Sequence, residues 1–461
     1  GGGTRAARPT LLLRLLAVAV TVSVARPVGV VGVGAAGGNH RQGDTGDLRT
    51  DGAEGVDRPG ELVTVGPARG DDDDRTLDVA VGLLGEVYAV GFFQNAGVDF
   101  DPANAHPDDV DVLSSANSRD GFLLKLDRDK NFQWVVQIAG DSGIWDLVTG
   151  VALDSQGNVL IAGSFSSFPS SVDFDLRREH TGNPDVVSSQ QGDGFVAKYS
   201  RDGTFRWVRT FGGGGQELIS DVFVDQSDNT YVSGTFMGVN VDFDRQNASP
   251  GDTLDAVADP APTPEDPNAT TPGTDTFVLK LDGDGSFQWV GGIGGVGFQR
   301  VSALTADDTG NVFAVGTFQN EVDFDPGAAE ELLISELNNE AFSFDAFALN
   351  LNSFGEFVWA HPAGIWGHDE ATDVTLDSNG NLIATGFFQG TVDFDPSSGV
   401  ANRTALAQDG FTWTLTSDGD FVFVQRFGGT GEDALNGVAY DSRGAVTVSG
   451  NFEATGTTPD M

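Results

Sequence analysis

The chain has 461 residues, of which 39% are hydrophobic and 20% are charged, with 63 glycines, 33 phenylalanines and no cysteine. This apolar content is enough to bury a sizeable core, while the lack of cysteine excludes a disulfide scaffold, a thiolate zinc site and a cysteine nucleophile. The formal net charge of -43 repels phosphate backbones and anionic lipids. We therefore expect a protein or carbohydrate ligand and no nucleic-acid partner.

Residues 1–36 have the pattern of an export signal, because three arginines precede a run of apolar or small residues over positions 15–25. This run is about half of the roughly 20 residues that span a bilayer, which favours a signal peptide over a membrane anchor. We expect an extracytoplasmic protein, secreted or at the cell surface, with no transmembrane anchor. Residues 37–59 are polar and glycine-rich, which predicts a flexible linker.

Residues 60–461 are dominated by an internal repeat. The tetrapeptide Val-Asp-Phe-Asp occurs five times, and its aspartates are Asp99 and Asp101, Asp173 and Asp175, Asp242 and Asp244, Asp323 and Asp325, and Asp393 and Asp395. A second motif, Asp-x-Phe, is followed 14 residues later by an aromatic residue, as from Asp120 to Trp134. The third motif is an Asp-x-x-Gly-Asn turn, with variants. A polar residue lies eight positions before each turn and is expected to bond backbone donors between blades: Asp74, Asp146, Glu217, Gln299, Asp369 and Asp433.

These motifs divide each unit into four short strands separated by turns. In the second unit the strands are expected at 150–153, 158–165, 195–199 and 204–211. Four antiparallel strands per repeat predict an all-β fold, a β-propeller built of four-stranded antiparallel blades. The aromatic residues expected in the blade cores are Phe122, Phe195, Phe277, Phe347, Phe411, Trp134, Trp207, Trp289 and Trp359.

The repeat predicts five complete blades and a partial sixth. The units are expected at about 77–145, 146–217, 218–299, 300–370 and 371–434, with 435–461 supplying part of another. Residues 61–65 resemble a fourth strand, so the two termini would share one blade and close a ring of six, which removes exposed sheet edges. The competing interpretation is a repeat array that stops before the blade is complete. The spacer over residues 248–275 is rich in Pro, Ala, Thr and Asp, which predicts a disordered surface insertion.

The second unit carries the residues of a known repeat. Val151-Ala-Leu-Asp-Ser-Gln-Gly-Asn-Val-Leu-Ile-Ala-Gly163, Val172-Asp-Phe-Asp175, Asp193-Gly-Phe-Val-Ala-Lys198 and Trp207 resemble the bacterial beta-propeller repeats known as SBBP repeats, found in large secreted proteins of environmental bacteria. The resemblance covers roughly residues 77–451 and implies the propeller fold but no reaction. The family name suggests seven blades, whereas this chain supplies five and a half.

The Val-Asp-Phe-Asp motif has two interpretations. In a strand, Asp99 and Asp101 share one face about 7 Å apart, so each of the five pairs could hold calcium together with loop carbonyls and water. In the structural interpretation, Val98 and Phe100 pack in the blade core while the aspartates cap turns and keep the edge soluble. We expect the structural role for all ten aspartates and keep calcium, the one cofactor suggested, as the alternative.

No catalytic residues are predicted. The five histidines occupy no equivalent repeat positions, only His368 adjoins an acid, and no serine nucleophile elbow occurs. The function best supported is a non-catalytic binding scaffold whose ligand contacts differ between blades. The alternative is an extracellular propeller hydrolase or lyase that acts on carbohydrates or esters with calcium in the central channel. That alternative requires His, Arg or carboxylate groups that converge at one mouth of the channel.

Overall fold

In the computed structural model, the residues described are 19–21, 62–64, 74–101, 110–140, 145–166, 171–175, 184–189, 192–247, 249, 251–256, 259–260, 270–271, 274–335, 343–365 and 367–453. Their regular structure is entirely β, which confirms the predicted fold class. The linker predicted at 37–59, most of the export segment and parts of the variable loops lie outside these residues.

Five blades are antiparallel sheets of four strands in chain order. The first is β3 (Arg75–Val81), β4 (Val87–Asp99), β5 (Val112–Leu126) and β6 (Phe132–Gly140), and the second is β7 (Trp145–Leu153), β8 (Val159–Ser166), β11 (Asp193–Tyr199) and β12 (Phe205–Phe211). The third is β13 (Glu217–Val224), β14 (Thr230–Met237), β19 (Thr274–Leu281) and β20 (Phe287–Val296), and the fourth is β21 (Gln299–Ala306), β22 (Val312–Phe318), β25 (Asp345–Leu351) and β26 (Phe357–Ala363). The fifth is β27 (Glu370–Leu376), β28 (Leu382–Asp393), β29 (Asn402–Leu415) and β30 (Phe421–Phe427).

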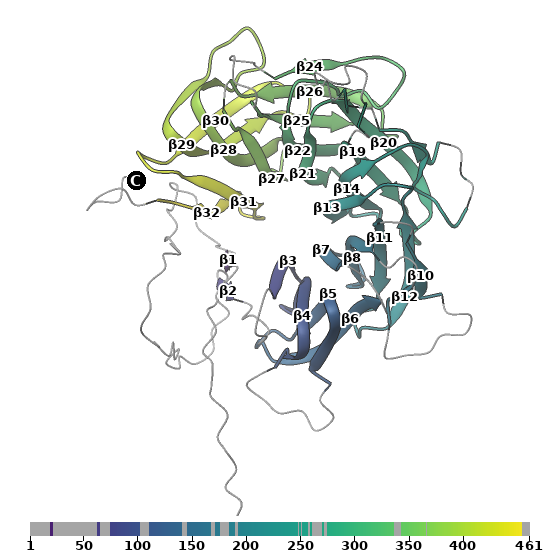
Figure 1. Ribbon diagram of the computed structural model, residues 1–461. Coiled ribbons are helices and arrows are strands. Elements are labelled where there is room, and N and C mark those ends of the chain that lie inside the picture. The colour runs from purple at the N-terminus through teal and green to yellow at the C-terminus, as the bar shows by residue number, and fades with distance from the viewer. Residues whose placement is uncertain are drawn as a thin grey trace, which may run out of the picture.

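The blades are arranged in a ring. Figure 1 shows the first strand of each blade nearest the centre and the fourth strand at the outside. Neighbouring blades contact each other through these inner strands, from β3 through β7, β13, β21 and β27 to β31 (Ala434–Tyr440). The molecule is therefore a β-propeller.

The sixth blade is assembled from both ends of the described chain. β31 pairs with β32 (Val446–Asn451), and the strand predicted over 61–65 is present as β2 (Leu62–Thr64). β2 pairs with β1 (Ala19–Thr21), and β1 lies against β32. No backbone ladder joins β1 to β32, so this blade consists of two separate two-stranded sheets rather than the single predicted sheet. β1 was not predicted as a strand, because its residues lie within the export pattern.

The ring has two different faces. Antiparallel pairing places the hairpin turns between strands one and two and between strands three and four on one face, which we call the turn face. The opposite face, which we call the arm face, carries the links between blades and the connections between strands two and three. Three of these connections are short hairpins, or arms: β9 (Ser171–Asp173) with β10 (Val186–Ser188), β15 (Val241–Asp242) with β16 (Thr253–Leu254), and β23 (Glu321–Asp323) with β24 (Leu332–Ile334).

Each of these arms also pairs with the preceding blade. β9 adds to β6, β23 adds to β20, and Asp242 bridges to Gly212. The segment predicted to be disordered at 248–275 differs from the expectation in its described parts. It contributes β16 to an arm, and β17 (Asp259–Pro260) pairs with β18 (Thr270–Thr271). Leu254 of β16 also packs against the core of the third blade, which gives this segment an apolar anchor.

The predicted aromatic core is confirmed for the phenylalanines. Phe122, Phe195, Phe277, Phe347 and Phe411 are buried. In the second blade, Phe174 of the repeated tetrapeptide packs edge-on against Phe195 with ring centroids 4.8 Å apart. This contact recurs around the ring, so the phenylalanine of the tetrapeptide completes the core beneath each arm.

The tryptophans differ from the prediction. Trp359 is buried, but Trp134, Trp207 and Trp289 are only half-buried, and all four lie against a glycine in the outer turn of the next blade. Trp207 covers Gly285 in the next blade's outer turn, where a Cβ would lie 2.9 Å from the indole. Gly285 has φ of 77°, which also favours glycine. The constant 14-residue spacing therefore positions a contact between blades as well as a hairpin register.

Candidate functional site

Of the ten aspartates of the repeated tetrapeptide, six lie in or just after the first strand of an arm, and the other four lie at or just after the ends of β4 and β28. In every copy the first aspartate accepts a hydrogen bond from the backbone N–H of the second, at 2.8 to 3.1 Å. Asp393 also accepts from Ala401 N at 2.7 Å, and Asp395 accepts from Ser397 N at 2.9 Å. The Val and Phe of each motif are buried, and the aspartates bond the backbone of the turn that follows them.

The calcium alternative for these aspartates remains a prediction. Over the described ranges, no group of three or more His, Asp or Glu side chains is close enough to hold a metal ion. The two carboxylates of a copy supply few of the six to eight oxygens that calcium takes, so loop carbonyls and water would have to supply the others.

Buried acids face each other at the blade junctions on the arm face. The aspartate of each Asp-x-Phe motif faces the polar residue eight positions before the next blade's turn: Asp120 with Asp146, Asp193 with Glu217, Asp345 with Asp369, and Asp409 with Asp433. Burial and the facing acid raise the pKa of Asp146, Glu217 and Asp369 to about 8. The fifth junction has an amide instead, and Gln299 donates to Asp275.

The polar residue at these junctions also accepts hydrogen bonds from backbone N–H groups, which fits the expectation for these positions. Asp369 accepts from Gln389 N at 2.7 Å and Asp433 accepts from Glu453 N at 2.8 Å, so each caps the second strand of its own blade. Glu217 differs, because its carboxyl group is fully buried and its backbone contact is with Gly213, which precedes its own blade's first strand. These groups hold the ring together and lie out of reach of a ligand.

One polar cluster joins the fourth and fifth blades. At the start of inner strands β21 and β27, Glu370 accepts hydrogen bonds from Arg300 and from Ser302 Oγ, the latter at 3.0 Å. His368 Nε2 lies 3.4 Å from Glu370 Oε2. The cluster lies on the arm face beside the channel, and the side chains of His368 and Arg300 are 49% and 43% exposed, so both can meet a ligand.

Aromatic rings surround this cluster. His368 lies between Phe344 and Phe387, with ring centroids 5.1 and 5.2 Å away, and Phe344 also contacts Phe298 at 5.8 Å. Phe298 is 40% exposed. We call this group of Arg300, Ser302, His368 and Glu370 with its three phenylalanines the mouth cluster. Exposed rings beside charged donors are the chemistry of a ligand site rather than of a core.

The charge state of the mouth cluster argues against acid–base chemistry. Burial alone would raise the pKa of Glu370, but His368, Arg300 and Ser302 hold the pKa below its usual value. A carboxylate held in this way is a weak base and does not supply a proton near neutral pH. Arg300 and His368 converge on Glu370 as the hydrolase alternative requires, but no second carboxyl takes part in this convergence.

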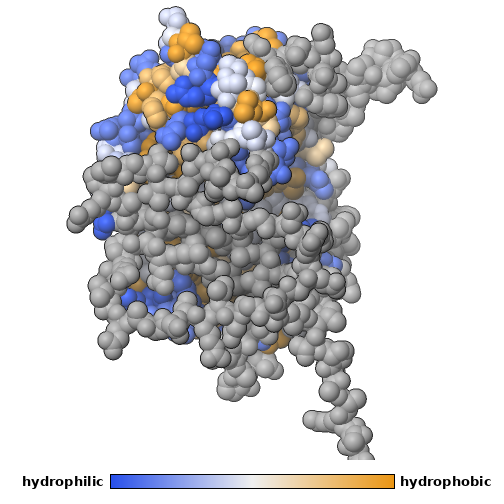
Figure 2. All heavy atoms as spheres, turned by 90° about the vertical axis from the view of Figure 1, so that its left-hand side faces the viewer, coloured by the Kyte–Doolittle hydropathy of each residue, from blue (hydrophilic) through white to orange (hydrophobic). Residues whose placement is uncertain are grey.

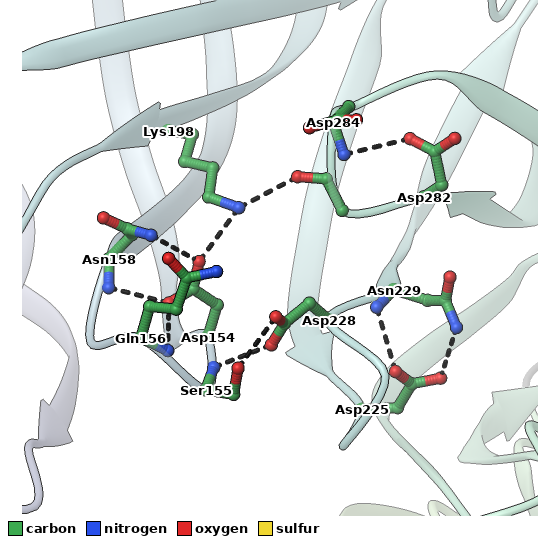
Figure 3. Close-up of polar contacts among 11 residues, drawn as sticks. Asp154, Ser155, Gln156, Asn158, Lys198, Asp225, Asp228, Asn229, Asp282 and Asp284 are labelled. Atoms are coloured by element: carbon green, nitrogen blue, oxygen red, sulfur yellow. Dashed lines mark hydrogen bonds and ion pairs between the residues drawn. The ribbon is translucent and has the colours of Figure 1, made fainter.

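The turn face is a continuous network of hydrogen bonds. Figure 3 shows Lys198 reaching from the second blade to the third, where its Nζ donates to Gly283 O. The same Nζ lies 2.9 Å from Asp154 of the second blade. In the same view Ser155 donates its N–H and hydroxyl to Asp228 of the next turn. The predicted Asp-x-x-Gly-Asn turns are confirmed, and their aspartates bond the turn's own backbone, as Asp154 does with Gln156 N and Asn158 N.

A hollow of about 480 Å³ opens on the turn face between the first three blades. Its lining includes Glu86, Asp154, Arg201 and Asp225, together with Leu83 and Leu84. Both leucines are exposed. Figure 2 shows another side of the molecule, where hydrophobic residues are dispersed among hydrophilic ones in the coloured upper part.

Comparison with known proteins supports the repeat architecture. The chain is 22% identical over 395 residues to an uncharacterized WD repeat-containing protein, L264, of Acanthamoeba polyphaga mimivirus. The match covers 75% of this chain and 27% of the relative, so the chain spans about a quarter of that protein's length. No family model matches the chain, and the resemblance to the SBBP repeats stays a prediction. Together with the sheet arrangement, the likeness defines the chain as a repeat β-propeller.

The mouth cluster was not predicted from the sequence, although a signal for it exists. Arg300 and Glu370 each follow the junction residue of their units, Gln299 and Asp369. Opposite charges at equivalent positions of consecutive units indicate a contact between neighbouring blades. Within the part of the chain that the structure describes, no helix is long and apolar enough to cross a membrane.

Proposed function

We propose that this propeller is a non-catalytic scaffold that binds carbohydrate at the mouth cluster. The observation that carries the proposal is the group of partly exposed rings around Arg300, His368 and Glu370, which brings aromatic and charged side chains together where the fourth and fifth blades meet. Apolar faces of sugar rings pack on aromatic side chains, and sugar hydroxyls bond to charged donors and acceptors. The likeness to a WD repeat-containing protein supports a binding role in general.

The rigidity of the ring supports binding over catalysis. The repeated polar residues are engaged in turns and junctions, and Glu370 is already bonded to three side chains. A glycosidase uses two carboxyl groups at a set separation on either side of the bond that it cleaves. The hydrolase or lyase alternative, with calcium in the channel, predicts turnover of chromogenic glycosides or esters that calcium increases and EDTA abolishes. We expect no turnover under either condition.

A glycan array probed with the labelled full chain tests the binding proposal. His368→Ala and Phe298→Ser change exposed side chains, so both variants should fold with an unchanged Tm. We expect both variants to lose the glycan signals of the wild type, because each removes a direct contact. Phe354→Ser is the matched control, since Phe354 is 76% exposed on the turn face. Array signals that persist in both variants, or that fall equally in the control, would refute a carbohydrate site at the mouth cluster.

The site of action is proposed to be outside the cytoplasm, secreted or at the cell surface. The support is the arginine-flanked apolar run within residues 1–36. Mass spectrometry of the mature protein tests this proposal, and we expect a new N-terminus close to residue 25. Cleavage there would remove β1, so β2 would be free to pair directly with β32. A protein that retains residues 1–36 in the cytoplasm would contradict export.

A further inference from the structure

The first blade's inner turn departs from the turn chemistry of the other blades. Where they have Asp at the first position, this turn has Gly82, and the carboxylate comes from Glu86 at the fifth position. Glu86 Oε2 accepts from Leu84 N at 3.0 Å, the same bond that Asp154 accepts from Gln156 N at 2.9 Å. The Glu86 carboxylate therefore stabilises this turn through the same backbone bond as the aspartates of the other turns. The side chains of its two central residues are not required for its conformation.

Those two central residues are Leu83 and Leu84, and nothing in the fold calls for leucine there. At the second position the other turns use polar residues that bond the neighbouring blade, as Ser155 does with Asp228 and Gln226 with Asp308. Leu83 is 96% exposed and Leu84 is 65% exposed. Two adjacent leucines in water, beside the polar side chains of the neighbouring inner turns, indicate a surface that a partner covers.

The chemistry of the adjacent hollow indicates what that partner carries. Its charged lining comprises three acids, Glu86, Asp154 and Asp225, and one base, Arg201, which pairs with Glu86 at 2.6 Å. Lys198 lies outside the lining and pairs with Asp154 at 2.9 Å, which leaves an excess of one negative charge at the hollow. Beneath the leucines the lining is apolar, with Val81, Leu153 and Val224. A net negative hollow in a chain of charge -43 attracts cations and repels anions.

We infer that the hollow and the Leu83–Leu84 turn form a docking site for a peptide segment of a partner protein in which basic and apolar residues alternate. The apolar side chains of the peptide cover the two leucines, and its basic side chains enter the acidic hollow. This site is on the face opposite the mouth cluster, so the inference does not depend on the carbohydrate proposal. The propeller would thus hold a ligand on the arm face and a protein partner on the turn face.

Three fluorescein-labelled octapeptides test this inference by fluorescence anisotropy with the full chain. One alternates leucine and arginine, one alternates leucine and glutamate, and one alternates serine and arginine. We expect saturable binding of the leucine–arginine peptide only. Leu83→Ser combined with Leu84→Ser should weaken that binding about tenfold or more, because the contact buries apolar side chains. Leu406→Ser, at a leucine that is 72% exposed on the fifth blade, should leave it unchanged.

A charge exchange tests the second part of the site. Gln156 lines the hollow at an exposed turn position, and only its backbone N–H bonds Asp154. Gln156→Lys should weaken the leucine–arginine peptide and Gln156→Glu should strengthen it, whereas Asn379→Lys at the equivalent position of the fifth blade should have no effect. Equal binding of the serine–arginine peptide, or equal loss in the Asn379 variant, would mean general attraction to an acidic protein and would overturn the inference. Absence of binding to the wild type would overturn it as well, while the glycan array reads out the mouth cluster separately.

Discussion

The buried acid pairs make the stability of the ring depend on pH, and Glu217 is the sharpest case. It is fully buried, it faces Asp193, and its backbone contact is with Gly213. Burial first, and the charge of Asp193 second, raise its pKa from 4.5 to about 8, although the backbone of Gly213 and then Arg245 beside Asp193 offset part of the shift. Glu217 is therefore protonated in the folded protein at neutral pH and ionised in the unfolded chain.

The sign of the effect follows from the raised pKa. The folded state binds the proton more tightly, so the stability that this group contributes is complete below pH 4.5 and is lost as the pH rises towards 8. At 1.36 kcal/mol per pH unit, the cost at pH 7 is about 3 kcal/mol. Glu217→Gln removes the titration, and Gln299 shows that an amide fits the equivalent junction. We expect the variant to be about 3 kcal/mol more stable than the wild type at pH 7 and equally stable near pH 4.

Thermal unfolding across this pH range measures the difference. With about 2.1 cal/mol/K of unfolding entropy per residue, 3 kcal/mol corresponds to about 3 °C in Tm for a chain of this size. The reverse change, Gln299→Glu, creates a fifth acid pair and should lower Tm progressively above pH 5. If the gain from Glu217→Gln is the same at pH 4 and pH 7, the group does not titrate as described, and the reasoning on buried acid pairs is wrong.

Three further predictions concern the blades. Gly285→Ala should lower the free energy of unfolding, measured in urea, by about 2 kcal/mol or more, because the added Cβ meets Trp207. Gly380 has φ of 78° and no atom within 4 Å of an added Cβ. Gly380→Ala should therefore cost only about 1 kcal/mol, from backbone strain alone. Equal losses would show that the indole contact is unimportant. Phe174→Ala removes a fully buried ring and should cost about 3 to 5 kcal/mol; a smaller loss than in Phe354→Ala would contradict its place in the core. In calcium titrations followed by Tm, the staple interpretation of the repeated aspartates predicts a response that magnesium and matched salt reproduce, and a saturable calcium-specific rise would favour the metal interpretation.

The features that could be predicted from the sequence are those that depend on contacts within a blade. The interval from Asp193 to Trp207 corresponds to the register of β11 with β12, in which Lys198 pairs with Trp207. Hairpins of this kind place residues that are close in sequence opposite each other, and a repeated pattern shows the arrangement several times. Phe174 and Phe195 could be assigned to the core for the same reason, because one arm and one blade bring them together.

The features that could not be predicted depend on how neighbouring blades pack. Trp207 was expected inside its blade, but its position is decided by Gly285, 78 residues further along, in the next blade. Arg300 and Glu370 are 70 residues apart and meet because β21 and β27 are adjacent inner strands. The inner turns of the other blades have polar residues at the positions of Leu83 and Leu84, so the repeat pattern did not predict that these two leucines flank a hollow. Sequence repeats reveal what all blades share, so the differences that form sites become visible only when the ring is assembled.

The inner strands show that the repeating unit of the ring is a pair of blades. Asp78, Asp221 and Asp373 occupy one position in the first, third and fifth blades, where the other three have Gly150, Ala303 and Gly437. Each aspartate accepts two backbone N–H groups, one from the residue that follows it and one from the next blade, as Asp78 does from Val79 at 2.7 Å and Val151 at 2.8 Å.

Three aspartates thereby satisfy six equivalent N–H groups, and the last of these is Val438 N, which donates to Asp373 across to β31. A small residue is needed in the alternate blades, since a Cβ on Gly150 would lie 2.9 Å from Val222 Cγ1. An alternation of this kind closes without a mismatch only when the number of blades is even. β31 and β32 supply Gly437 and Val438 N to this alternation, so they follow the fifth blade in the same pattern as the complete blades.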